Sequence, residues 1–187
     1  EHGAEAVQES IKLATPYPID GVYAVEDYAA DVLDIYRGNV AQPISTGFPL
    51  LDTIYRVMPG TFCAVTGIPN HGKSSFMDQI AVNLARQESW RFAVFSPEQS
   101  VANHIRRLSE KVAAKPFDVG PTHRMTEGEL QLAMEFLSKH FHFIESRDTV
   151  PNIDWILAKS RAACVRHGVK GIIIDPYNEI DATRTGG

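Results

Sequence analysis

The spacing of apolar residues along the chain predicts helices that alternate with short strands. In five stretches, apolar positions recur every three or four residues, as they do on the buried face of an amphipathic helix. Shorter unbroken runs of β-favouring residues lie between most of these stretches and predict strands. The expected helices span residues 25–37, 73–88, 101–114, 126–140 and 152–167. The expected strands span residues 61–66, 91–96, 141–144 and 171–175.

Strands that alternate with helices predict an α/β fold, in which a mostly parallel sheet is covered by helices on both faces. The apolar run at 171–175 is unbroken, which is typical of a strand buried on both sides. Residues 1–42 are predicted to form an N-terminal arm and a linker helix, and residues 43–187 a single core. The linker helix has an apolar stripe that needs a partner, such as a neighbouring subunit.

Charge and cysteine content exclude several classes of protein. With 18 Lys+Arg against 23 Asp+Glu, the net charge is −5, which excludes a basic arm or a chain covered in positive charge. A local patch or a ring of subunits could still bind nucleic acid. No apolar run of 18 residues predicts a membrane span. Cys63 and Cys164 lie in apolar segments without metal-binding spacing, which predicts reduced core thiols in a cytoplasmic protein.

The clearest motif spans residues 67–74 and matches the phosphate-binding pattern G-x-x-x-x-G-K-[ST]. The glycines Gly67 and Gly72 allow the backbone to curl so that its N–H groups face a phosphate, next to the positive end of a helix. Lys73 would contact the β- and γ-phosphates, and the Ser74 hydroxyl would bind Mg²⁺. The predicted nucleotide-binding residues are Gly67, Pro69, Asn70, His71, Gly72, Lys73, Ser74 and Ser75.

Two carboxylates follow predicted strands and complete the expected site. Asp175 ends the apolar run at 171–175, where a phosphate-binding loop needs an acidic residue to hold Mg²⁺ through water. Glu98 follows the strand at 91–96, where it could activate the attacking water. From its spacing alone, Glu98 could equally be an ordinary acidic residue near a helix start.

These motifs together resemble the motor domain of the RecA-type hexameric replicative helicases of the DnaB type, with phage primase–helicases and Twinkle-type helicases the most similar branches. The resemblance covers roughly residues 43–180. It adds the lead-in at 45–52 (STGFPLLD) and the segment at 95–99 (FSPEQ), which is similar to the family's F-S-L-E-M motif. It implies a RecA-like fold, ATP or another NTP with Mg²⁺, and catalytic roles for Glu98 and Lys73. Asp175 and Ser74 are the implied metal ligands, and single-stranded DNA and a hexamer the implied partners.

The resemblance also implies what the chain lacks. The family's sensor strand, DNA-binding loops and arginine finger would follow residue 187, so we expect a fragment with an incomplete core, from a bacterial or phage-infected cell. Without an arginine from a neighbouring subunit, residues 1–187 are expected to bind nucleotide weakly and hydrolyse it slowly. Two other functions stay open: another RecA-like ATPase, such as a recombinase or circadian-clock-type ATPase, and a regulatory module that only binds nucleotide.

Overall fold

The computed structural model describes residue 3 and residues 21–146 and 151–176, which fall into two compact units. The first unit is Glu1–Ala41 and the second is Gln42–Gly187. In the first unit, a 3₁₀ turn (η1, Val25–Tyr28) leads into α2 (Ala29–Arg37). Gly38 ends this helix in the left-handed conformation, with φ 73°. The predicted helix therefore forms, and its apolar side chains are exposed.

In the described part of the second unit, three parallel strands form one sheet. β1 lies in the centre, with Phe92 opposite Phe141 on one side and Gly171 on the other. The strands are β1 (Phe92–Phe95), β2 (Phe141–Ile144) and β3 (Gly171–Ile174), in the order β2-β1-β3. Because all three strands are parallel, their carboxyl ends lie along the same edge of the sheet.

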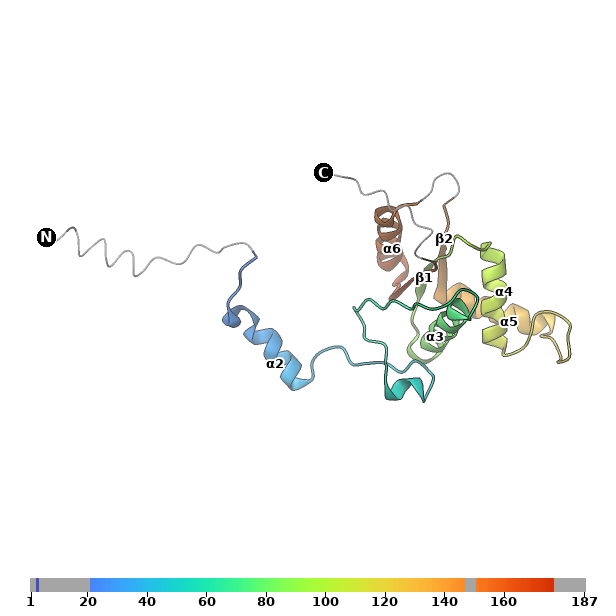
Figure 1. Cartoon of the computed structure of the whole chain (residues 1–187), viewed down its shortest axis with the longest axis horizontal. Helices are drawn as coiled ribbons and strands as arrows, with labels where there is room; N and C mark the ends of the chain where they lie inside the picture. The colour runs from blue at the N-terminus through green and yellow to red at the C-terminus, as the bar shows by residue number, and fades with distance from the viewer. Residues whose placement is uncertain (1–2, 4–20, 147–150, 177–187) are drawn as a thin grey trace. The chain divides into compact units, whose positions relative to one another are not determined.

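Helices cover both faces of this sheet, so the predicted α/β fold is confirmed (Figure 1). Successive strand residues point to opposite faces. Phe92 and Val94 pack with the core against α3, α4 and α5, whereas Phe95 packs with Ile156 of α6. The helices are α3 (Lys73–Glu88), α4 (Val101–Ala113), α5 (Glu127–His140) and α6 (Ile153–His167).

Capping residues place the starts of these helices where the sequence predicts them. Thr126 accepts a hydrogen bond from the backbone of Glu129, and the Glu129 carboxylate accepts one from the backbone of Thr126, which completes the capping box of α5. Ser100 and Asn152 cap α4 and α6 through their side-chain oxygens. All four helices of the second unit therefore match their predicted positions closely.

The predicted strand at 61–66 is wrong, because these residues form no strand and are exposed. Phe62 is 90% exposed. β-favouring side chains form a strand only where they pair with a neighbouring strand, and residues 61–66 pair with none of the three described strands.

The expectation that β3 is buried on both faces is also wrong. Ile172 of this edge strand is 44% exposed, while every residue of β1 is buried. Cys63 and Cys164 are free but exposed, so they are not core thiols. Cys63 lies in the unpaired segment, and Cys164 lies on an exposed stretch of α6.

Candidate functional site

The predicted phosphate-binding loop is an exposed turn that leads directly into α3. Gly72 is the N-cap of this helix with φ 81°, and Asn70 has φ 62°, so two residues of the loop are left-handed. Gly72 offers no capping side chain, and the first N–H groups of a helix lack intrahelical partners. The loop therefore presents backbone donors at the positive end of the α3 dipole, which is the environment an anion requires.

The Lys73 ammonium group lies across the mouth of this loop. Its Nζ donates hydrogen bonds of 3.0 Å to the carbonyl oxygens of both Gly67 and Ile68. His71 folds back in the same turn, with its Nδ1 2.9 Å from the Pro69 carbonyl. The Lys73 side chain is thus hydrogen-bonded to the backbone of its own loop. Pro69 has no N–H to donate, so it can shape the loop but cannot hydrogen-bond a phosphate through its backbone.

The two serines after Lys73 have different surroundings. Ser74 is half-buried at the first turn of α3, one residue from the loop lysine. The Ser75 hydroxyl accepts a 2.8 Å hydrogen bond from Lys111 on α4. Sequence reasoning did not find this second cation beside the loop, because Lys111 lies 36 residues further along the chain.

The two candidate carboxylates follow the carboxyl ends of β1 and β3. The backbone N–H of Asp175 donates a 3.0 Å hydrogen bond to the Phe95 carbonyl, which extends the pairing of β3 with β1 by one residue. Asp175 is therefore half-buried beside the start of the loop that carries Glu98. Glu98 itself is exposed.

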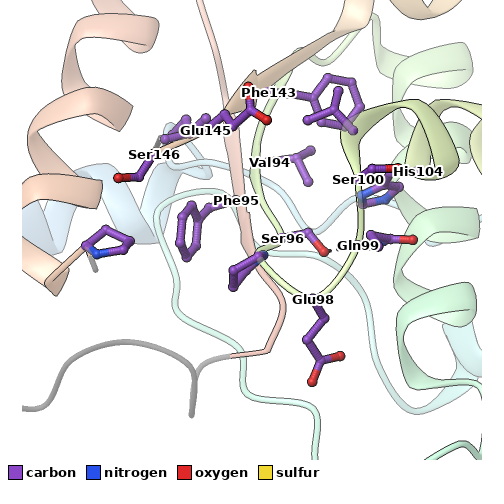
Figure 2. Close-up of a pocket in the computed structure, with 14 residues that line it drawn as sticks. Val94, Phe95, Ser96, Glu98, Gln99, Ser100, His104, Phe143, Glu145 and Ser146 are labelled. Atoms are coloured by element: carbon purple, nitrogen blue, oxygen red, sulfur yellow. Dashed lines mark hydrogen bonds between the residues drawn. The ribbon is translucent and has the colours of Figure 1, made fainter. Parts of the chain in front are cut away.

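A cavity of about 340 Å³ lies at the carboxyl ends of β1 and β2, and Glu98 is on its wall. Figure 2 shows the Glu98 side chain pointing away from the other labelled residues. Gln99 braces the same loop, with its Nε2 3.3 Å from Ser96 Oγ. His104 lines the cavity from α4, and its ring packs edge-on against Phe143 of β2, with 5.5 Å between centroids.

The lead-in at 45–52 is a structural clamp onto α3. Asp52 accepts hydrogen bonds from Ser45 Oγ at 2.5 Å and from both the backbone and the hydroxyl of Thr46 at 2.7 Å. These donors hold the pKa of Asp52 below its usual value, the Ser45 hydroxyl contributing most. The Thr46 carbonyl in turn accepts from Asn83 of α3 at 2.9 Å, next to Gly47, which has φ 80°. The motif therefore fixes the start of the core to the helix that follows the phosphate loop.

A buried charged cluster that sequence reasoning missed joins α3 to α4. Asp78 accepts 2.8 Å hydrogen bonds from His104 Nε2 and from Arg107 Nη2. Burial alone raises the pKa of Asp78, but the hydrogen bonds and charges of His104 and Arg107 outweigh it and lower the pKa. Asp78 shares one face of α3 with the buried Ala81, Val82 and Ala85, a periodicity that could have marked it as inward-facing.

The structure leaves the phosphate loop and the two carboxylates as separate parts. No hydrogen bond or ion pair between described residues joins residues 67–74 to Glu98 or Asp175. What links them is the packing of α3 on α4 and the pairing of β1 with β3. A glycine-rich turn before a helix, with acidic residues after neighbouring parallel strands, is the arrangement typical of P-loop α/β proteins.

Residues 43–185 match the family described as the DnaB-like helicase C terminal domain, and the chain belongs to that family. It is 40% identical over 191 residues to the Twinkle homolog protein, chloroplastic/mitochondrial, of Arabidopsis thaliana. That match covers 98% of the chain and 27% of the relative. The relative comes from a plant and is named for organelles, so it lends no support to the bacterial or phage setting expected from the sequence.

The fold is similar to that of a solved protein described as "The Structure Of A DnaB-Like Replicative Helicase And Its Interactions With Primase". The TM-score is 0.67 at 18% identity, over 100% of the chain and 45% of the solved one. This likeness confirms the RecA-like fold implied by the motifs. Within the described part of the chain, no helix combines the length and the apolar character needed to cross a membrane.

Proposed function

We propose that the chain is the nucleotide-binding part of the motor of a replicative DNA helicase, which hydrolyses ATP or another NTP to move along single-stranded DNA. The single observation that carries the proposal is the match of residues 43–185 to the DnaB-like helicase C terminal domain. The phosphate loop and both carboxylates lie within that match. The chain spans 27% of its relative, so the activity belongs to the longer protein.

The phosphate loop is proposed to bind the nucleotide. Backbone N–H groups of residues 67–75 would surround the β-phosphate, Pro69 excepted, at the N-terminus of α3. Lys73 already lies over the loop, held by two carbonyl oxygens. A phosphate would replace those neutral acceptors with charged ones, which an ammonium group binds more strongly. The backbone N–H groups of the loop and the Lys73 ammonium group would therefore bind the same nucleotide.

Ser74 and Asp175 fit a magnesium site by their chemistry. Both offer the oxygen ligands that Mg²⁺ prefers, and no described residue forms an ion pair with Asp175. The Ser74 hydroxyl would hold the ion directly, and Asp175 would hold it through water. A bound Mg²⁺ would neutralise charge on the β- and γ-phosphates.

Glu98 is proposed as the general base. It follows the central strand by three residues, is exposed and extends away from its neighbours (Figure 2), so a water molecule can reach it. Its carboxylate would orient that water toward the γ-phosphate and accept its proton. The exposed apolar side chains of α2 fit a ring, in our proposal a hexamer, because docking on a neighbouring subunit would cover them.

Unwinding of a forked DNA duplex by the full-length protein tests the proposal. Lys73→Ala should reduce both nucleotide-dependent unwinding and NTP hydrolysis on single-stranded DNA by about 100-fold or more. Lys170→Ala, an exposed lysine outside the site, is the matched control and should behave as the wild type. Hydrolysis without any unwinding would favour the other RecA-like ATPases, and nucleotide binding without hydrolysis would favour a regulatory module.

A further inference from the structure

We propose that the buried cluster of Asp78, His104 and Arg107 positions the Glu98 loop relative to the phosphate loop, so that Asp78 and His104 are positioning residues for NTP hydrolysis. The inference rests on the proposed function. It assigns a role to three residues that lie outside the phosphate loop and the two carboxylates.

The cluster bridges the two helices that carry the separated halves of the site. Asp78 lies on α3, which begins at Lys73, and His104 and Arg107 lie on α4. α4 begins at Val101, directly after the loop that holds Glu98. The cluster lies within the first two turns of both helices and therefore acts close to both halves, whereas a contact near their far ends does not.

Burial makes this contact specific. Asp78 is 3% exposed and His104 2%, so the carboxylate has little access to water. A buried charge is stable only where it is paired and hydrogen-bonded. Each Asp78 oxygen has one partner at 2.8 Å, one from His104 and one from Arg107. Sliding α4 along α3 would separate at least one of these pairs, so the cluster holds the two helices in one register.

The orientation of His104 depends on Asp78. Nδ1, the other ring nitrogen of His104, is buried and has no hydrogen-bond partner among the described residues. Among the described residues, Asp78 is therefore the only polar group that fixes the ring, which packs against Phe143 and lines the same cavity as Glu98. Loss of the Asp78 carboxylate would free the ring, and with it the first turn of α4.

Ordinary helix packing is the competing explanation, and the chain offers a control for it. Arg86 of α3 donates a hydrogen bond to the Val112 carbonyl of α4, near the far ends of both helices. Arg86→Met removes a link between the same helices without touching the Glu98 side. If the cluster only helped the helices to pack, Arg86→Met and a variant of Asp78 or His104 would lower hydrolysis alike. If the cluster positions the Glu98 loop, only the variants of Asp78 and His104 would do so.

The test measures hydrolysis and backbone hydrogen exchange in the full-length protein. Asp78→Asn and His104→Leu should lower kcat about 10-fold with nucleotide Kd unchanged within about 3-fold. The phosphate loop binds the nucleotide, whereas the cluster places only the loop that carries Glu98. Backbone amides at residues 96–100 should exchange about 10-fold faster. His104→Gln, which keeps a donor for Asp78, should recover most of both losses. Arg86→Met should change neither by more than about 2-fold.

Arg107→Gln keeps the test open if Asp78→Asn does not fold, because the Arg107 side chain is 34% exposed and tolerates replacement. It should give a smaller loss of the same kind. Losses no larger than those of Arg86→Met, or equal losses in His104→Gln and His104→Leu, would overturn the proposal. If the wild type does not hydrolyse NTP, the proposed function fails, while the exchange measurement still decides whether the cluster holds the loop.

Discussion

The central strand β1 and the edge strand β3 differ sharply in how well they are covered. β1, the central strand, packs with α3, α4 and α5 in a closed core, and all four of its residues are buried. In contrast, Ile172 of the edge strand β3 is 44% exposed, and Phe62 of the apolar run at 61–66 is 90% exposed. Equally apolar segments therefore differ in burial, because burial depends on which helices and strands pack against each segment.

Truncating one buried and one exposed apolar side chain should give the largest difference in stability. Leu108 of α4 is fully buried, so Leu108→Ala should lower the free energy of unfolding by about 3 kcal/mol. Ile172→Ala on β3 should cost less than about 1 kcal/mol, because much of that side chain is already in water. Urea unfolding of both variants provides the measurement. Equal losses would mean that β3 is as well covered as the central core.

A backbone position gives the next largest effect. Gly47 has φ 80°, and a Cβ there would overlap the Asn83 side chain that holds the Thr46 carbonyl. Gly47→Ala should therefore cost about 2 kcal/mol, since both strain and a clash are introduced. Gly60→Ala is the control, because Gly60 has the same φ of 80° with nothing near its Cβ. If both variants lose the same stability, the clash with Asn83 contributes nothing.

The pH dependence of stability should carry the signature of the buried cluster. Because the pKa of Asp78 is lowered in the folded chain, its contribution is present above the unfolded pKa and is lost as pH falls through the folded pKa. The urea midpoint of the wild type should fall as pH decreases below about 4, and Asp78→Asn should flatten that part of the profile. Identical slopes in the two proteins would show that another group causes the acid loss.

Thiol chemistry tests the exposure of the segment 61–66 and of α6 with the smallest perturbation. Cys63 and Cys164 are both exposed, so both should react with a thiol reagent in the folded chain at rates within about 10-fold of a free thiol. Single Cys→Ser variants assign each rate. Slow reaction of Cys63 that speeds up in urea would show that residues 61–66 are covered, contrary to the structure.

The sequence predicts the features that depend on neighbours along the chain. The helices predicted at 25–37, 73–88 and 126–140 form, and the signals that bound them are local: Gly38, the turn before Lys73, and the capping box of Thr126 and Glu129. The strand at 61–66 is wrong for the opposite reason, since a strand needs a partner that sequence periodicity does not identify.

The sequence did not predict the cluster of Asp78, His104 and Arg107, because Asp78 is far from the other two along the chain. Asp78 and His104 are 26 residues apart, and no pattern in one sequence pairs them. A polar residue on the apolar face of a predicted helix is the one available signal, and Asp78 shows it. The roles of Lys73, Ser74, Glu98 and Asp175 follow from motif and resemblance, and they stay predictions.

Separating nucleotide binding from hydrolysis in the full-length protein tests the proposed role of Glu98 as general base. Glu98→Gln should lower kcat for NTP hydrolysis on single-stranded DNA by about 100-fold or more, while the nucleotide Kd stays within about 3-fold of the wild type. Glu127→Gln, the same change at an exposed position on α5, should leave both values unchanged. Hydrolysis by Glu98→Gln at the wild-type rate would contradict the proposed role of Glu98 as general base.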